Sequence, residues 1–150
     1  MPSGYSLDTS TTGQVKLVSN NPFDSWINGF ASLTNPADKT ATADPDYDGL
    51  ANVVEFVLNG NPANGAITNL PTLTASGSNL VFTYTRRDDS ESLNPVVEFD
   101  ADLSGVWTTA VDGSNCTIVV TENDANPDTV TVTIPKQANA KLFARLKVNP

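Results

Sequence analysis

The 150-residue sequence predicts a mainly β protein with a small α part, in which an antiparallel seven-stranded β-sandwich follows a short helical segment. Two observations support this fold class. From residue 70 onward, short stretches of alternating apolar and polar residues recur about every ten residues, with turn residues between them, which is typical of an antiparallel sandwich. Between residues 21 and 62, apolar residues instead recur at helical spacing on either side of an acidic loop. The length suits one ordinary domain, so we expect one compact unit.

The first 20 residues predict an extended segment. Residues 5–18 contain two short stretches around a Ser/Thr/Gly turn, and Val15 and Leu17 alternate with polar residues in the second stretch. Such a segment is consistent with the tail of a preceding β-domain. We therefore expect the chain to begin partway along a longer exported protein.

Residues 21–33 predict a short amphipathic helix. Asn21 is suited to cap its start, Pro22 suits the first helical position, and Asp24 lies in the positive first turn. We expect the apolar face of this helix to be buried against the sandwich, rather than to form a platform for a ligand. The residues of that face recur at helical spacing: Phe23, Trp26, Ile27, Phe30 and Leu33.

Residues 44–55 carry oxygen-bearing side chains at regular positions of a twelve-residue loop. Aspartates occupy positions one, three and five, Gly49 position six, a polar residue position nine and Glu55 position twelve. Acidic side chains this close together repel one another, and a hard divalent cation removes the repulsion. A solvated acidic turn has no reason to combine Gly49 with Glu55. We therefore predict a Ca²⁺ site with these ligands: Asp44, Asp46, Asp48, the Leu50 carbonyl, Asn52 and Glu55.

A second short helix is predicted directly after this loop. Its apolar face consists of Val53, Val54, Val57 and Leu58, and Gly60 and Pro62 follow its end. Residues 21–62 therefore predict a helix–calcium loop–helix segment that lies on the strands of residues 63–150.

Residues 44–62 resemble the bacterial thrombospondin type 3-like calcium repeat, whose pattern is an Asp-x-Asp-x-Asp-Gly loop, a Glu at position twelve, a short helix and an Asn/Asp-Pro ending. The stretch is also similar to one half of an EF-hand or dockerin. The resemblance implies a secreted or cell-surface bacterial protein with the loop beside β-domains. The motif occurs once, which argues against a dockerin because dockerins pair two loops.

Strands dominate the rest of the chain. In the clearest one, Val130, Val132 and Ile134 are expected to face inward and the intervening threonines outward. The lone Cys116 lies on the apolar parity of its strand, which predicts a small buried hydrophobe. Seven strands are predicted, at 70–75, 79–87, 95–100, 105–109, 116–121, 128–134 and 141–148.

Composition excludes several classes of function. Seventeen acidic residues against eight basic ones give a net charge of −9, which disfavours nucleic acid and anionic membranes as partners. The absence of histidine removes His-dependent triads and His-ligated zinc. No apolar run is long enough to span a membrane. Since Ca²⁺ is plentiful outside cells, we expect an extracellular or cell-surface location.

The sequence contains no legible catalytic constellation, so we predict a non-catalytic calcium-binding structural or adhesive module, with polysaccharide or another surface protein as candidate partners. The alternative is a carbohydrate-binding module appended to an exported enzyme. That alternative needs exposed aromatic rings. Tyr84 and Trp107 are expected in the core, which leaves Phe143 as the best exposed candidate.

One further acidic stretch, residues 122–128, lies between the last strands. Its composition suits a second ion or a solvated loop. We favour the solvated loop.

Overall fold

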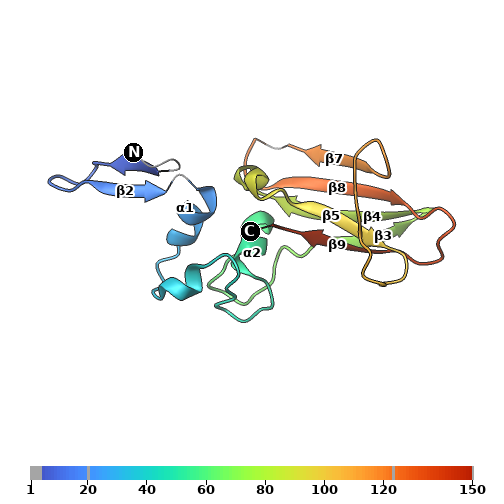
Figure 1. Ribbon diagram of the computed structural model, residues 1–150, viewed down its shortest axis with the longest axis horizontal. Coiled ribbons are helices and arrows are strands. Elements are labelled where there is room, and N and C mark those ends of the chain that lie inside the picture. Colours follow the sequence, from blue (N-terminus) through green and yellow to red (C-terminus); the bar gives the residue numbers. More distant parts are fainter. Residues whose placement is uncertain (1–4, 20, 123, 150) are drawn as a thin grey trace.

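The computed structural model describes residues 5–19, 21–122 and 124–149, so residues 1–4 and 20 of the predicted N-terminal segment lie outside the described residues. A β-hairpin lies at one end of the molecule, two facing sheets lie at the other, and the helices lie between them (Figure 1). The elements are β1 (Tyr5–Asp8), β2 (Lys16–Ser19), α1 (Pro22–Asn28), η1 (Pro36–Lys39), α2 (Asn52–Leu58), β3 (Thr72–Ser76), β4 (Asn79–Arg86), η2 (Asp88–Leu93), β5 (Val96–Asp100), β6 (Thr108–Thr109), β7 (Thr117–Thr121), β8 (Asp128–Pro135) and β9 (Phe143–Lys147).

The prediction of a mainly β protein with a small α part is confirmed, but the predicted strand count is not. The described residues form nine strands in three antiparallel sheets, β1-β2, β3-β4-β8-β7 and β6-β5-β9. Seven of these strands lie beyond residue 70, and each overlaps one predicted segment. The two additional strands arise because residues 5–19 pair with each other in a hairpin, with Leu7 opposite Leu17. Tyr5, Leu7 and Leu17 of that hairpin are exposed, and none of the three belongs to a core.

One apolar core lies between the larger sheets. On β4 and β8, opposite residues are both buried, including Phe82 opposite Val132 and Leu80 opposite Ile134. Val97 of the second sheet is part of the same core. Cys116 is also buried there, as predicted. Because both sheets turn their alternating apolar residues toward this cluster, their outer faces carry mostly polar side chains.

The first helix begins as predicted but ends early. The Asn21 side chain accepts a 3.0 Å hydrogen bond from Phe23 N–H and Pro22 occupies the first turn, but the helix stops at Asn28. Gly29 follows, and a Cβ there would lie 3.1 Å from the Trp26 carbonyl oxygen. Phe30 lies beyond the end of the helix.

The apolar face of α1 packs on α2, and not directly on the sheets as predicted. Phe23 and Phe56 make an edge-to-face contact with ring centroids 5.7 Å apart. Trp26 and Phe30 are only half-buried at the margin of this second core. The reason is that α2, which is buried on more than one side, occupies the space beside the sheets: Val57 and Leu58 enter the first core while Val53 and Phe56 enter the second.

Polar contacts also join α2 to β4. The Thr85 hydroxyl donates a 2.8 Å hydrogen bond to the Leu58 carbonyl, and the Arg87 backbone N–H donates to the Val57 carbonyl at 3.0 Å. These bonds satisfy carbonyls that a helix end leaves without intrahelical partners. The Arg87 guanidinium lies 5.1 Å from the centre of the Phe56 ring. The helix that follows the acidic loop is thus fixed to the sheet. No helix among the described residues is long and apolar enough to cross a membrane.

Candidate metal centre

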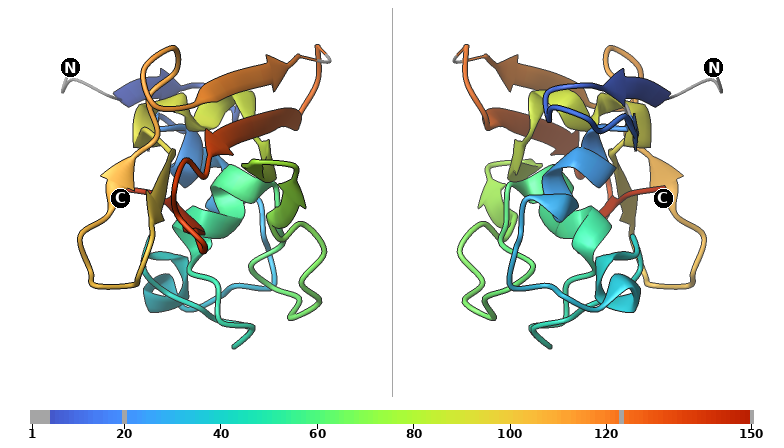
Figure 2. Two further views of the ribbon diagram at one scale, coloured as in Figure 1. Left: turned by 90° about the vertical axis from the view of Figure 1, so that its right-hand side faces the viewer. Right: turned by 90° about the vertical axis from the view of Figure 1, so that its left-hand side faces the viewer.

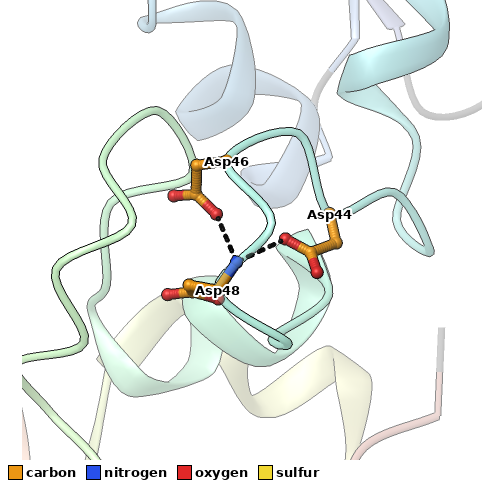
Figure 3. Close-up of side chains that lie close together, drawn as sticks. All are labelled: Asp44, Asp46 and Asp48. Atoms are coloured by element: carbon orange, nitrogen blue, oxygen red, sulfur yellow. Dashed lines mark hydrogen bonds between the residues drawn. The ribbon is translucent and has the colours of Figure 1, made fainter.

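The loop before α2 brings three aspartates together. Asp44, Asp46 and Asp48 each place a carboxylate oxygen within 4.8 Å of the others (Figure 3). All three side chains are only partly exposed. Three negative charges in this space repel one another unless a cation lies among them.

Hydrogen bonds to the loop backbone fix these carboxylates. Asp48 N–H donates to Asp44 Oδ1 at 3.2 Å and Gly49 N–H donates to Asp44 Oδ2 at 3.0 Å. Leu50 N–H donates to Asp48 Oδ1 at 2.8 Å. The backbone can turn this tightly because Tyr47 and Gly49 have positive φ angles of 60° and 92°. This conformation is easy for Gly49 and costly for Tyr47, whose side chain is 89% exposed.

Backbone hydrogen bonds close the loop on itself. Asn52 N–H donates to the Ala43 carbonyl at 2.8 Å and Val53 N–H donates to the Ala41 carbonyl at 3.0 Å. These carbonyls accept hydrogen bonds from N–H groups of the first turn of α2, which has no side-chain cap. The start of the helix is therefore tied to the start of the loop.

Asn52, predicted as a ligand, is fully buried. Its side-chain amide donates 2.8 Å hydrogen bonds to the carbonyls of Asp38 and Thr40. Its Oδ1 has no hydrogen-bond partner among the described residues. The Asn52 Nδ2 group thus binds the segment that precedes the loop, and Oδ1 accepts no hydrogen bond from the described residues.

Glu55, the residue at position twelve, is 2% exposed, and its Oε2 has no hydrogen-bond partner among the described residues. The pKa of its carboxyl is raised to about 7, first by burial and then by the charges of Asp46, Asp48 and Asp44, against an opposing backbone hydrogen bond from Asn61. Glu55 is not in the group of carboxylates within 4.8 Å of one another. Its charge is nevertheless coupled to all three aspartates.

A cavity of about 10 Å³ is lined by Glu55, by Asp48 and Leu50 of the loop, and by residues of the segment after α2. That volume accommodates about one water-sized particle. Asp46 also has a buried oxygen, Oδ2, without a hydrogen-bond partner among the described residues. Burial raises the pKa of the Asp46 carboxyl, and the charge of Asp48 adds to the effect. Buried carboxylate oxygens without partners are costly unless the carboxyl is protonated or a cation lies beside it.

The segment after α2 folds back over this site, which the sequence did not predict. The backbones of Asn61 and Asn64 interact with the carboxyls of Glu55 and Asp46, respectively. Gly65 packs so closely that a Cβ would lie 3.2 Å from the Asp46 carbonyl oxygen. The glycines at positions 60 and 65 were the sequence signal that could have predicted this close packing, since close approach of two backbones often requires glycine.

The structure thus brings Asp44, Asp46 and Asp48 together, with Glu55 buried beside them and Leu50 in the wall of the cavity. The complete ligand set remains a prediction. Comparison of the chain with protein-family models, with curated proteins and with solved structures found no significant match.

Proposed function

We propose that the protein is a non-catalytic calcium-binding module with a structural or adhesive role in a larger secreted or cell-surface bacterial protein. The observation that carries this proposal is the buried Glu55 Oε2, which lacks a hydrogen-bond partner among the described residues and belongs to a carboxylate beside three converging aspartates. A carboxylate in such a place is either protonated or matched by a cation.

The ligand chemistry favours calcium. Every predicted ligand offers oxygen, and flexible cages of six to eight oxygens suit Ca²⁺ better than zinc or copper. The sequence contains no histidine, and its lone cysteine lies in the core between the sheets. The resemblance of residues 44–62 to the thrombospondin type 3-like repeat supports the same ion.

The position of α2 supports a structural role. This helix contributes side chains to both apolar cores and begins at the acidic loop. A cation held by Glu55 and the aspartates would fix the first turn of α2 against the loop. It would thereby stiffen the helical segment against the two facing sheets, which form the proposed β-sandwich.

The carbohydrate-binding alternative has less support. Trp107 is half-buried, and the Arg145 guanidinium lies 4.1 Å from the centre of its ring. Phe143 is half-buried rather than exposed, and Tyr84 is buried in the core. None of the three presents a freely exposed ring face for a sugar. A glycan array would test the alternative directly. Binding of a glycan on the array would favour it and would require a site other than these three rings.

Calorimetry tests the proposal. A chelator-stripped sample should bind Ca²⁺ with a dissociation constant of roughly 10⁻⁴ to 10⁻³ M, the range of extracellular modules. Asp48→Asn should remove the binding at the acidic loop, whereas Asp124→Asn, a matched change in an exposed turn, should not. The absence of binding heat at millimolar Ca²⁺, together with an unchanged melting temperature, would contradict the proposal.

A further inference from the structure

A second group of carboxylates lies at one end of the four-stranded sheet. Asp88 begins η2, Glu122 follows β7, and Asp128 begins β8. Each of the three places a carboxylate oxygen within 4.8 Å of the others. The site is distant from the acidic loop, because β7 and β8 lie on the opposite side of the molecule from residues 44–48 (Figures 1 and 2).

Asp128 distinguishes this group from an ordinary acidic surface. It is 1% exposed, although it comes from the stretch for which a solvated loop was predicted. Both of its carboxylate oxygens are buried and have no hydrogen-bond partner among the described residues. A buried carboxylate needs a compensating charge or hydrogen bonds.

Arg86 is the nearby cation, but it does not compensate these charges fully. Its Nη2 lies 3.6 Å from Asp128, 3.8 Å from Glu122 and 3.8 Å from Glu91, all beyond the usual length of a charge-assisted hydrogen bond. Its Nε is itself buried without a hydrogen-bond partner among the described residues. One guanidinium therefore faces three carboxylates, and Asp88 adds a fourth negative charge to the group.

The segments that carry these acids are already joined. Asp88 N–H donates a 2.7 Å hydrogen bond to Asn126 Oδ1, which connects the start of η2 to the turn between β7 and β8. Asp88 and Glu122 are exposed while Asp128 is buried. A cation here would have protein oxygens on one side and water on the other, an arrangement that hard divalent cations accept readily.

We propose that Asp88, Glu122 and Asp128 form a second Ca²⁺ site, which ties the turn between β7 and β8 to the start of η2. The site is independent of the acidic loop before α2, since it shares no residue with that loop. A Ca²⁺ ion bound here would place a positive charge beside the Asp128 carboxylate. The Arg86 Nη2 lies 3.6 Å from that carboxylate.

Equilibrium dialysis with radioactive Ca²⁺ tests the proposal through stoichiometry. The wild-type protein should bind two ions, and the double variant Asp88→Asn/Glu122→Gln should bind one. Both substitutions are at exposed positions, so the fold should persist. Asp124→Asn changes a neighbouring exposed acid outside the group and should leave two ions bound. Two ions in the double variant, or binding in the wild type that the double variant does not alter, would overturn the proposal.

Paramagnetic broadening by Mn²⁺ in NMR spectra locates the second ion. Amide signals near residues 88, 122 and 128 should broaden in the wild type and at least tenfold less in the double variant at equal Mn²⁺. Broadening confined to residues 44–55 would overturn the second site while leaving the first intact. Conversely, Asp48→Asn should remove only the first site. If the wild type bound a single ion, and the double variant lost it while Asp48→Asn kept it, the result would support the second site and contradict the first.

Discussion

The backbone N–H of Gly60 donates a 2.7 Å hydrogen bond to the carbonyl oxygen of Glu55, and a Cβ at residue 60 would lie 3.0 Å from Glu55 Oε1. The same Cβ would lie 3.3 Å from the Glu55 Cα, so rotation of the side chain alone would not relieve the contact. The end of α2 therefore limits where the Glu55 carboxylate can lie.

We expect Gly60→Ala to weaken Ca²⁺ binding about tenfold, or about 1.4 kcal/mol, because the Glu55 carboxylate must move. Calorimetry measures the change. In a Glu55→Gln background the same substitution should have little further effect on binding, since the displaced ligand is already lost. An additive loss in the double variant would mean that Gly60 acts on the loop by another route.

Chelation should lower the melting temperature. Free Ca²⁺ at about ten times its dissociation constant adds roughly 1.4 kcal/mol to the free energy of unfolding, which corresponds to about 3 to 6 °C for a chain of this size. Asp48→Ala and Glu55→Gln should remove the part of this response that comes from the ion at the acidic loop, whereas Asp124→Ala should retain the full response. Differential scanning calorimetry with and without chelator measures all four proteins.

The stability of the calcium-free protein should depend on pH through Glu55. Its pKa is about 7 in the folded protein and 4.5 without the fold, so the folded state binds more protons between these values. The free energy of unfolding should therefore fall as pH rises, with the Glu55 contribution complete below about pH 4.5 and lost through about pH 7. Denaturant titrations of wild type and Glu55→Gln check this, because only the difference between them isolates Glu55 from other acids.

The same titration should couple to the metal. Since Ca²⁺ binds the ionised carboxylate, binding near pH 6 should release a proton, and the apparent affinity should rise with pH up to about 7. Calorimetry in buffers of different ionisation enthalpy measures the released proton. Equal affinity at pH 5.5 and pH 7.5 would show that Glu55 is not a ligand.

Phe56 should matter more to stability than Trp26. Phe56 is fully buried between α1 and Arg87, whereas Trp26 is half-buried at the margin of the same core. Phe56→Ala should cost about 3 to 5 kcal/mol because it leaves a cavity, and Trp26→Ala should cost less. Urea denaturation gives both values. A greater cost for Trp26→Ala would mean that the helical face is covered in solution.

Hydrogen exchange should show where calcium acts. Removing the ion should reduce protection mainly from residue 40 to residue 55, where the loop closes on the start of α2. The end of α2 should remain protected, because Thr85 and Arg87 hold the carbonyls of Leu58 and Val57. Strands β3 to β9 have their own apolar core and should also remain protected. Loss of protection throughout residues 72–147 would contradict this division.

Local patterns predicted much of the fold. The seven segments beyond residue 70 overlap the observed strands because alternation of apolar and polar residues reflects which face is buried. The predicted end of the first helix was wrong because Phe30 continues the helical spacing although it lies beyond Asn28, where α1 ends. The β1–β2 pairing was missed because its alternation covers few residues and because Tyr5, Leu7 and Leu17 enter no core.

The sequence by itself determined the grouping of Asp44, Asp46 and Asp48, because alternate residues of one tight turn meet whatever the rest of the chain does. Tertiary structure alone decided that Glu55 is buried beneath the segment after α2. It also decided that Asp88 meets Glu122 and Asp128 across more than 30 residues of chain. Such contacts depend on how the sheet orders β4, β7 and β8, and this order follows from the burial of whole strand faces rather than from any short spacing of residues.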